Sequence, residues 1–242
     1  MRSVRRGPKP QILIDNERGW TLELINELNR ISEDIPLDDK HRQAKINRQC
    51  KVSQVKKSIS SRYNSPDIKQ ALQNMYEKRC CYCEGKITPQ IIDHIEHLRP
   101  KSLFPHLIVD WDNLHCCCPV CNQNKQDQWD FKNPILDPTV DKVEDYLRFD
   151  LNTGQVINIK GDLRTQNTID YPKLNRPELV EERKSIILSY AKKLKYVKQL
   201  KDRLPEELRL EIIKRYIKMQ TLNDSYPTLH QQILEGLENE EE

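Results

Sequence analysis

Seven of the eight cysteines lie between Cys80 and Cys121, and four of them form two CxxC pairs. The pairs are Cys80 with Cys83 and Cys118 with Cys121, and each can place two thiolates on one metal ion. Two such pairs complete the tetrahedral sulfur set that is usual for structural zinc. The alternative, that the cysteines are small buried apolar residues, explains the paired spacing less well. We expect zinc to join the two ends of residues 84–117.

The residues between and after the cysteine pairs offer the groups that phosphodiester hydrolysis needs. The reaction requires an activated water, a cation on the phosphate oxygens and assistance to the leaving oxygen. Histidine suits the base because its ordinary pKa lies near neutrality, and oxygen or imidazole ligands suit a hard divalent ion. Such groups occur in the runs Asp93-His94-Ile95-Glu96-His97, Trp111-Asp112-Asn113-Leu114 and Cys121-Asn122-Gln123-Asn124-Lys125.

The segments that precede this central stretch are expected to be helical. Apolar residues at helical spacing predict a helix near 17–33, and residues 38–60 are expected to form a basic helix. Ser65 and Pro66 are a typical helix start, with Ser65 as the N-cap and Pro66 in the first turn. We therefore expect an N-terminal basic helical region over 1–79 and a catalytic core over 80–133.

The region from 134 to 242 is expected to be mostly helical with one minor β hairpin. The hairpin is predicted over 147–159, with its turn at 152–154. A long helix follows through 186–197, and Pro205 opens another. The predicted apolar face of that helix contains Leu208, Ile212 and Tyr216.

Charge is distributed unevenly along the chain, although the formal net charge is only +3. Residues 40–79 contain eleven lysines and arginines against Asp67 and Glu77. A basic segment of this kind suits contact with nucleic-acid phosphates, and the simpler alternative is a solvated helix face. No run approaches the ~20 apolar residues of a membrane span, and no secretory signal is visible. We expect a cytoplasmic protein without a membrane contact.

The order of the central motifs resembles that of the HNH nucleases. Acid-His-x-x-Pro over 96–100, Asn113-Leu114, and C-x-x-C-[His/Asn]-x-x-Lys over 118–125 follow the HNH order, and the cysteine pairs match the zinc-containing branch. Within that group the chain is similar to the PtuB nucleases of Septu and retron anti-phage systems. The similar runs are Tyr82-Cys83-Glu84, His94–Ser102 and Trp111–Leu114, with the flanks Met1–Val4, Pro10–Leu13 and Thr168–Leu179.

The resemblance implies a mainly α fold with a small ββα-metal element (HNH, His-Me finger) held together by the four-cysteine zinc site. It also assigns roles to residues. His97 would be the general base, and Glu96 and Asn122 would bind the catalytic ion, Mg²⁺ or else Mn²⁺ or Ni²⁺. Asn113 would stabilise the hairpin loop, and Lys125 would contact a phosphate or support the site. Leu98 stands where the family usually has a bulky aromatic residue.

Asp93-His94 is a second acid-His pair, three residues before the first. Glu96-His97 is preferred because only this pair is followed at the right interval by Pro100. Asp93 and His94 are then expected to support the metal ligands from behind, with His94 as the alternative base.

The resulting hypothesis is an endonuclease of an anti-phage system, with DNA favoured and RNA or tRNA open as the substrate. The resemblance implies an ATPase partner of the PtuA type and, in retron versions, a reverse transcriptase with its RNA–DNA hybrid. A second hypothesis is a zinc-dependent subunit that binds nucleic acid without cutting it. A third is a structural subunit whose site has decayed.

Overall fold

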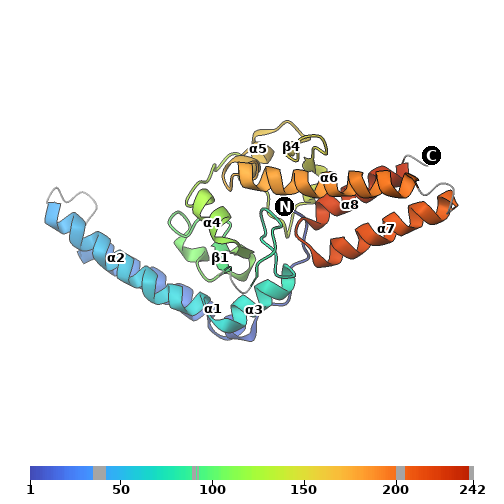
Figure 1. Ribbon diagram of the computed structural model, residues 1–242. Coiled ribbons are helices and arrows are strands. Elements are labelled where there is room, and N and C mark those ends of the chain that lie inside the picture. The colour runs from blue at the N-terminus through green and yellow to red at the C-terminus, as the bar shows by residue number, and fades with distance from the viewer. Residues whose placement is uncertain (35–41, 89–90, 92, 200–204, 240–242) are drawn as a thin grey trace.

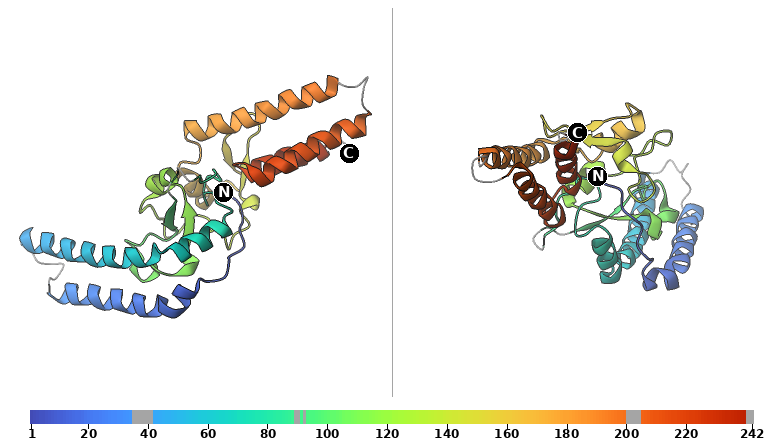
Figure 2. Two further views of the ribbon diagram at one scale, coloured as in Figure 1. Left: turned by 60° about the horizontal axis from the view of Figure 1, so that its bottom comes forward. Right: turned by 90° about the vertical axis from the view of Figure 1, so that its right-hand side faces the viewer.

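The computed structural model describes residues 1–34, 42–88, 91, 93–199 and 205–239. These residues form a mainly helical protein with two small antiparallel hairpins, as the sequence predicts. Figures 1 and 2 show a central body from which two groups of long helices extend in different directions. The helices are α1 (Gln11–Asp34), α2 (Arg42–Tyr63), α3 (Pro66–Met75), α4 (Pro119–Lys125), α5 (Leu163–Asp170), α6 (Pro177–Gln199), α7 (Glu206–Asn223) and α8 (Pro227–Asn239).

The first group of helices is the antiparallel pair α1 and α2. On α1, the buried Leu24 and Ile31 are seven residues apart, so they lie on one face of the helix. A bidentate ion pair between Arg62 of α2 and Glu23 of α1 joins the two helices. The predicted helices near 17–33 and 38–60 are confirmed within the described residues. The first begins earlier than predicted, at Gln11.

The helix predicted after Ser65 is also confirmed. The Ser65 side chain accepts a hydrogen bond from the backbone N–H of Ile68, and Pro66 occupies the first turn. Ile68 and Leu72 point from α3 into the core. The helix ends at Met75, and the chain then reaches Cys80 through residues with positive φ at Glu77 and Lys78.

The central hairpin consists of β1 (His94–His97) and β2 (Leu114–Cys117), followed directly by α4. The strands pair antiparallel, with His94 opposite Cys117 and His97 opposite Leu114. Between them the chain forms two short 3₁₀ turns, η1 (Pro105–Leu107) and η2 (Trp111–Asn113). Cys118 is the N-cap of α4, so the second cysteine pair opens this helix as predicted.

The C-terminal part contains the second hairpin and the second group of long helices. Strands β3 (Leu147–Phe149) and β4 (Val156–Asn158) pair within the predicted range, and Gly154 in their turn has φ +74°. The prediction for α7 was wrong in phase: Leu208 and Ile212 are 46% and 44% exposed, whereas Ile213 and Ile217 are buried. The break at 224–226 and the separate helix α8, which begins at Pro227, were not predicted.

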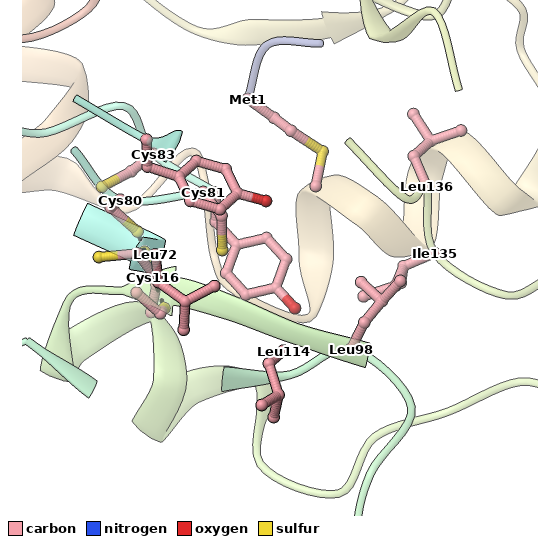
Figure 3. Close-up of a cluster of buried hydrophobic side chains, with 14 of the residues drawn as sticks. Met1, Leu72, Cys80, Cys81, Cys83, Leu98, Leu114, Cys116, Ile135 and Leu136 are labelled. Carbon is pink, nitrogen blue, oxygen red and sulfur yellow. Dashed lines mark hydrogen bonds between the residues drawn. The ribbon is translucent and has the colours of Figure 1, made fainter. Parts of the chain in front are cut away.

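Two apolar clusters stabilise the molecule. The larger one contains most of the cysteines and surrounds the central hairpin, and Figure 3 shows Cys80, Cys81, Cys83 and Cys116 near Leu72 and Met1. The Met1 ammonium is buried 3.0 Å from the Glu84 carboxylate. The smaller cluster lies among α6, α7 and α8. Among the described helices, none combines the length and apolar character of a membrane span.

Candidate metal centre and active site

The four cysteines of the two CxxC pairs converge on one point. Their Sγ atoms all lie within 4.8 Å of one another, and those of Cys83 and Cys118 are 3.9 Å apart. Tetrahedral zinc with bonds of about 2.3 Å would space its sulfur ligands about 3.8 Å apart. The four residues are therefore placed to hold a metal ion such as zinc. Such an ion would connect the turn after α3 to the N-terminus of α4.

A fifth sulfur, that of Cys117, lies 3.7 Å from the Cys80 sulfur and forms a second possible group with Cys80 and Cys81. Burial raises the pKa of Cys117 well above its ordinary value, and its thiol donates to the Cys118 carbonyl. By contrast, hydrogen bonding, first of all from Cys117, lowers the pKa of Cys118 to about 4. The pKa of Cys121, in the CxxC set, is also raised by its neighbours, so the pKa values do not separate the two sets. The CxxC set is favoured because it supplies the four sulfur ligands of a structural zinc site, whereas the alternative group supplies three.

Arg176, which precedes α6, supplies a positive charge beside these sulfurs. Its Nη1 lies 3.4 Å from the Cys121 sulfur and also donates to two backbone carbonyls. Burial alone would lower the pKa of Arg176, but the charges of Cys121, Cys83 and Cys118 raise it on balance. The cysteine site was predictable from spacing, whereas a cation 55 residues further along the chain was not. In the sequence, the only feature that pointed to Arg176 was its position in Thr168–Leu179, one of the runs that are similar to the PtuB nucleases.

His97 ends β1 and is only 6% exposed. Its Nε2–H donates to the Ile108 carbonyl at 2.8 Å. Because a carbonyl only accepts, this contact places the proton on Nε2 and leaves the lone pair on Nδ1. The Tyr63 ring packs edge-on against the imidazole, with ring centroids 4.7 Å apart. Burial, with smaller effects from Lys101 and Lys125, lowers the pKa of His97 to about 3, so the ring is neutral.

His94 and Glu96 lie on the opposite face of β1 from His97, because side chains alternate along a strand. Helix α4 covers this face, and Asn122 and Lys125, three residues apart, point toward it from one side of α4. The Asn122 side-chain nitrogen lies 2.8 Å from His94 Nδ1 at the exposed end. Glu96 and Lys125 form the second contact between β1 and α4, at the buried end.

Glu96 is held by protein donors. Its Oε1 lies 2.8 Å from the Lys125 ammonium and accepts a hydrogen bond from the Tyr82 hydroxyl at 3.1 Å. Burial raises the pKa of Glu96, although the Lys125 charge opposes the shift. In the described arrangement Glu96 contacts Lys125 and Tyr82, and the metal-ligand pair Glu96–Asn122 stays a prediction. The residue that Asn122 contacts is His94, and an amide and an imidazole are suitable ligands for a divalent ion.

Lys125 requires a correction, because its side chain is fully buried. Besides Glu96, its ammonium contacts the His97 carbonyl at 3.1 Å. Burial excludes the phosphate contact that we predicted for this residue in the described arrangement. The Lys125 ammonium instead holds both Glu96 and the strand backbone at His97, and its role as a supporting group of the site stays a prediction.

Asn113 connects the two ends of the loop between β1 and β2. Its side-chain oxygen accepts from the backbone N–H of Arg99, and its side-chain nitrogen donates to the carbonyls of Arg99 and Leu107. The loop that carries Ile108 is thereby tied to the end of β1. Asp93 precedes β1, and its charge acts with burial and Cys80 to raise the pKa of Cys116.

Several of the basic residues in the N-terminal region bind the protein itself. Arg6 donates to the carbonyls of Trp111, Leu114 and Asp112. Arg79 is buried and bonds to Glu77 and to the Asp224 carbonyl. Part of the basic charge predicted for phosphate contact thus stabilises the fold. Helix α2 retains a run of lysines and arginines without an acidic residue.

These features define a mainly helical protein whose central hairpin and short helix are joined by a four-cysteine cluster suited to zinc. No family model matches the chain. It is 33% identical over 136 residues to a Septu protein PtuB of Bacillus thuringiensis, which covers 54% of this chain and 50% of that protein. A Septu protein PtuB of Bacillus mycoides (strain KBAB4) is 26% identical over 154 residues, or 51% of this chain and 52% of that protein.

A third relative, of Vibrio cholerae serotype O1 biovar El Tor, bears the name "Retron Vc95 putative HNH endonuclease". It is 29% identical over 136 residues, which cover 50% of this chain and 63% of that protein. The chain thus spans about half the length of the curated relatives it matches. These names confirm the resemblance to PtuB-family HNH proteins that the motifs predict.

Proposed function

We propose that this protein is an HNH endonuclease that hydrolyses phosphodiester bonds in nucleic acid. The observation that carries the proposal is the geometry of His97: the Ile108 carbonyl accepts from its Nε2–H and leaves the Nδ1 lone pair to take a proton. The names of the relatives support the same chemistry. We propose DNA as the favoured substrate, with RNA or tRNA as the alternative.

In the proposed reaction, Nδ1 of His97 takes the proton of the attacking water. The Ile108 carbonyl then stabilises the charged ring through the Nε2–H, and Lys125 holds the strand backbone at His97 from the other face. A divalent ion, Mg²⁺, Mn²⁺ or Ni²⁺, would stabilise charge on the phosphate oxygens.

The first experiment compares cleavage of plasmid DNA, single-stranded DNA and total tRNA by wild type, His97→Ala and His94→Ala. We expect His97→Ala to lower the cleavage rate roughly a hundredfold or more, because general-base catalysis contributes on this order. Added imidazole is expected to restore part of the rate in His97→Ala, and unchanged zinc content would show that the variant is folded. Full cleavage by His97→Ala, with loss only in His94→Ala, would transfer the base role to His94.

One observation favours the second hypothesis, a zinc-dependent subunit that binds nucleic acid without cutting it. Glu96 pairs with Lys125 and Asn122 contacts His94, so both predicted metal ligands are engaged with the protein itself. Binding of nucleic acid without turnover, with any of the three ions, would support this function over the nuclease.

The relatives also suggest a setting. Two of them are named as Septu proteins and one as a retron protein. We therefore propose a role in anti-phage defence, with an ATPase of the PtuA type as partner and, in a retron setting, a reverse transcriptase with its RNA–DNA hybrid. Repeating the cleavage assay with a co-expressed ATPase would show whether the nuclease is active only with that partner.

A further inference from the structure

Aromatic rings from two separate segments meet beside the central hairpin. Phe104 immediately precedes η1 in the loop after β1, and its ring lies 5.6 Å from Trp129 and 5.6 Å from Phe131, measured between centroids. Trp129 and Phe131 belong to the segment that follows α4. The segments that leave β1 and α4 are thus connected through a cluster of three rings, which we call the aromatic platform.

The platform is exposed on one side, at Phe131, while Phe104 and Trp129 are half-buried. Phe131 is 71% exposed, although Phe104 supports it from one side, and the neighbouring Leu103 is 46% exposed. A single exposed apolar side chain is ordinary, but a set of mutually supported rings indicates a surface for contact. Val140 is 81% exposed and is not part of such a set.

The platform is connected to His97 through the same loop. The His97 ring donates to the carbonyl of Ile108, the residue directly after η1, and Phe104 is the residue directly before η1. On the other side of His97, the Tyr63 ring contacts the imidazole, and the Lys101 ammonium lies 5.4 Å from the Tyr63 ring centroid. The site and the platform therefore stand at the two ends of one short turn.

Basic side chains accompany the rings. Arg99 and Lys132 are exposed, and Lys101 is half-buried and donates to the Tyr63 hydroxyl. The acidic residues of the segment 126–133 are Asp127 and Asp130. The Asp130 carboxylate is engaged by backbone N–H groups of the following turn. Rings interleaved with cations are the combination that binds single-stranded nucleic acid, through base stacking and phosphate contact.

We propose that Phe104, Trp129 and Phe131 form a stacking surface for unpaired nucleobases, which guides a single-stranded segment toward His97. This proposal rests on the nuclease function and deepens it, because it selects single strands, or unpaired loops, over duplex. The bases of an intact duplex are stacked on one another and cannot reach the exposed Phe131 ring.

The test measures binding in the cleavage-deficient His97→Ala protein by fluorescence anisotropy, with labelled oligothymidylate and with a duplex of equal length. Adding Phe131→Ala is expected to weaken single-strand binding about tenfold, because one base loses its stacking partner. Phe131→Tyr is expected to retain the affinity, and duplex binding is expected to stay unchanged. Val140→Ala is the matched control for removal of an exposed apolar side chain.

The proposal is overturned if the parent protein does not bind oligothymidylate, or if Phe131→Ala binds it as tightly as the parent. Equal losses in Phe131→Ala and Phe131→Tyr would also overturn it, as would a loss shared with the duplex or with Val140→Ala. Because binding is measured without turnover, the result is independent of whether the wild type cleaves. The cleavage assay tests the nuclease function and the binding assay tests the stacking surface, so the failure of one proposal is distinguishable from the failure of the other.

Discussion

At the residue scale, the contacts of the ring nitrogens separate the buried histidines of the described residues into two kinds. In His115, Nδ1 contacts the Tyr76 hydroxyl at 2.6 Å and Nε2 lies 3.4 Å from the Arg6 guanidinium. In His230, both nitrogens are likewise in contact, with Tyr190 and with the Ser225 carbonyl. These two rings stabilise the fold. His97 differs because its carbonyl contact uses Nε2 and leaves a lone pair on Nδ1.

Because His97 is buried, we expect it to make the folding stability of the protein sensitive to acid. The unfolded chain binds a proton near the ordinary pKa of 6.5, whereas the folded ring does so only at about 3. Stability must therefore fall as the pH drops from the first value toward the second. Between about pH 7.5 and about pH 5.5, we expect wild type to lose about 1.4 kcal/mol of folding stability more than His97→Gln. Urea unfolding at both pH values measures the difference, and equal losses would contradict the shifted pKa.

At the scale of elements, the hairpin and α4 depend on contacts that their own short lengths do not provide. Strands β1 and β2 have four residues each and α4 has seven. Elements this short are marginal alone. The Lys125 contacts join α4 to β1, the Asn113 bonds close the loop, and the cysteine cluster joins the start of α4 to the turn after α3.

Removal of one cysteine of the proposed zinc site should therefore unfold this unit. We expect Cys121→Ser to lose zinc and to lower the melting temperature by about 10 °C or more, because metal binding contributes folding free energy. Cys50→Ser, which changes an exposed cysteine outside the cluster, is the control. Cys117→Ser is expected to retain zinc. Loss of zinc from this variant would favour the alternative sulfur set, which contains Cys117. Elemental analysis and thermal unfolding give both quantities.

At the scale of the whole molecule, the two groups of long helices are stabilised in different ways. The pair α1 and α2 is joined in part by charges such as Arg62 and Glu23, whereas α6, α7 and α8 share a small apolar cluster of their own. Buried Arg183 of α6 joins the second group to the body by donating to the carbonyls of Gly154 and Leu174. The division into regions at 79 and 133 stays a prediction.

The phase of α7 can be tested by two substitutions that remove the same atoms. Ile217 is fully buried and Ile212 is 44% exposed. We expect Ile217→Ala to lower the free energy of unfolding by about 2–4 kcal/mol and Ile212→Ala by roughly 0.5 kcal/mol or less. Urea unfolding of both variants gives the comparison. Similar losses would show that the exposed stripe packs against something in solution.

Local patterns in the sequence were sufficient for features that depend on neighbouring residues. The cysteine spacing predicted the four-cysteine cluster, Ser65-Pro66 predicted the start of α3, and residues 147–159 predicted the second hairpin. Each follows from geometry within a few residues, where chain connectivity itself brings the groups together. The family resemblance also followed from short runs whose order is read directly from the sequence.

Only the tertiary structure decided which partner each polar side chain meets. Glu96 pairs with Lys125, Asn122 with His94, and Arg176 with the cysteines, because the packing of α4 and α6 selects these neighbours. The same reason explains why the predicted buried face of α7 was wrong. The helical periodicity allowed two adjacent rows of apolar residues, and packing against α6 and α8 buried only one of them. Burial also set the charge state of His97, since desolvation depends on atoms contributed by distant segments.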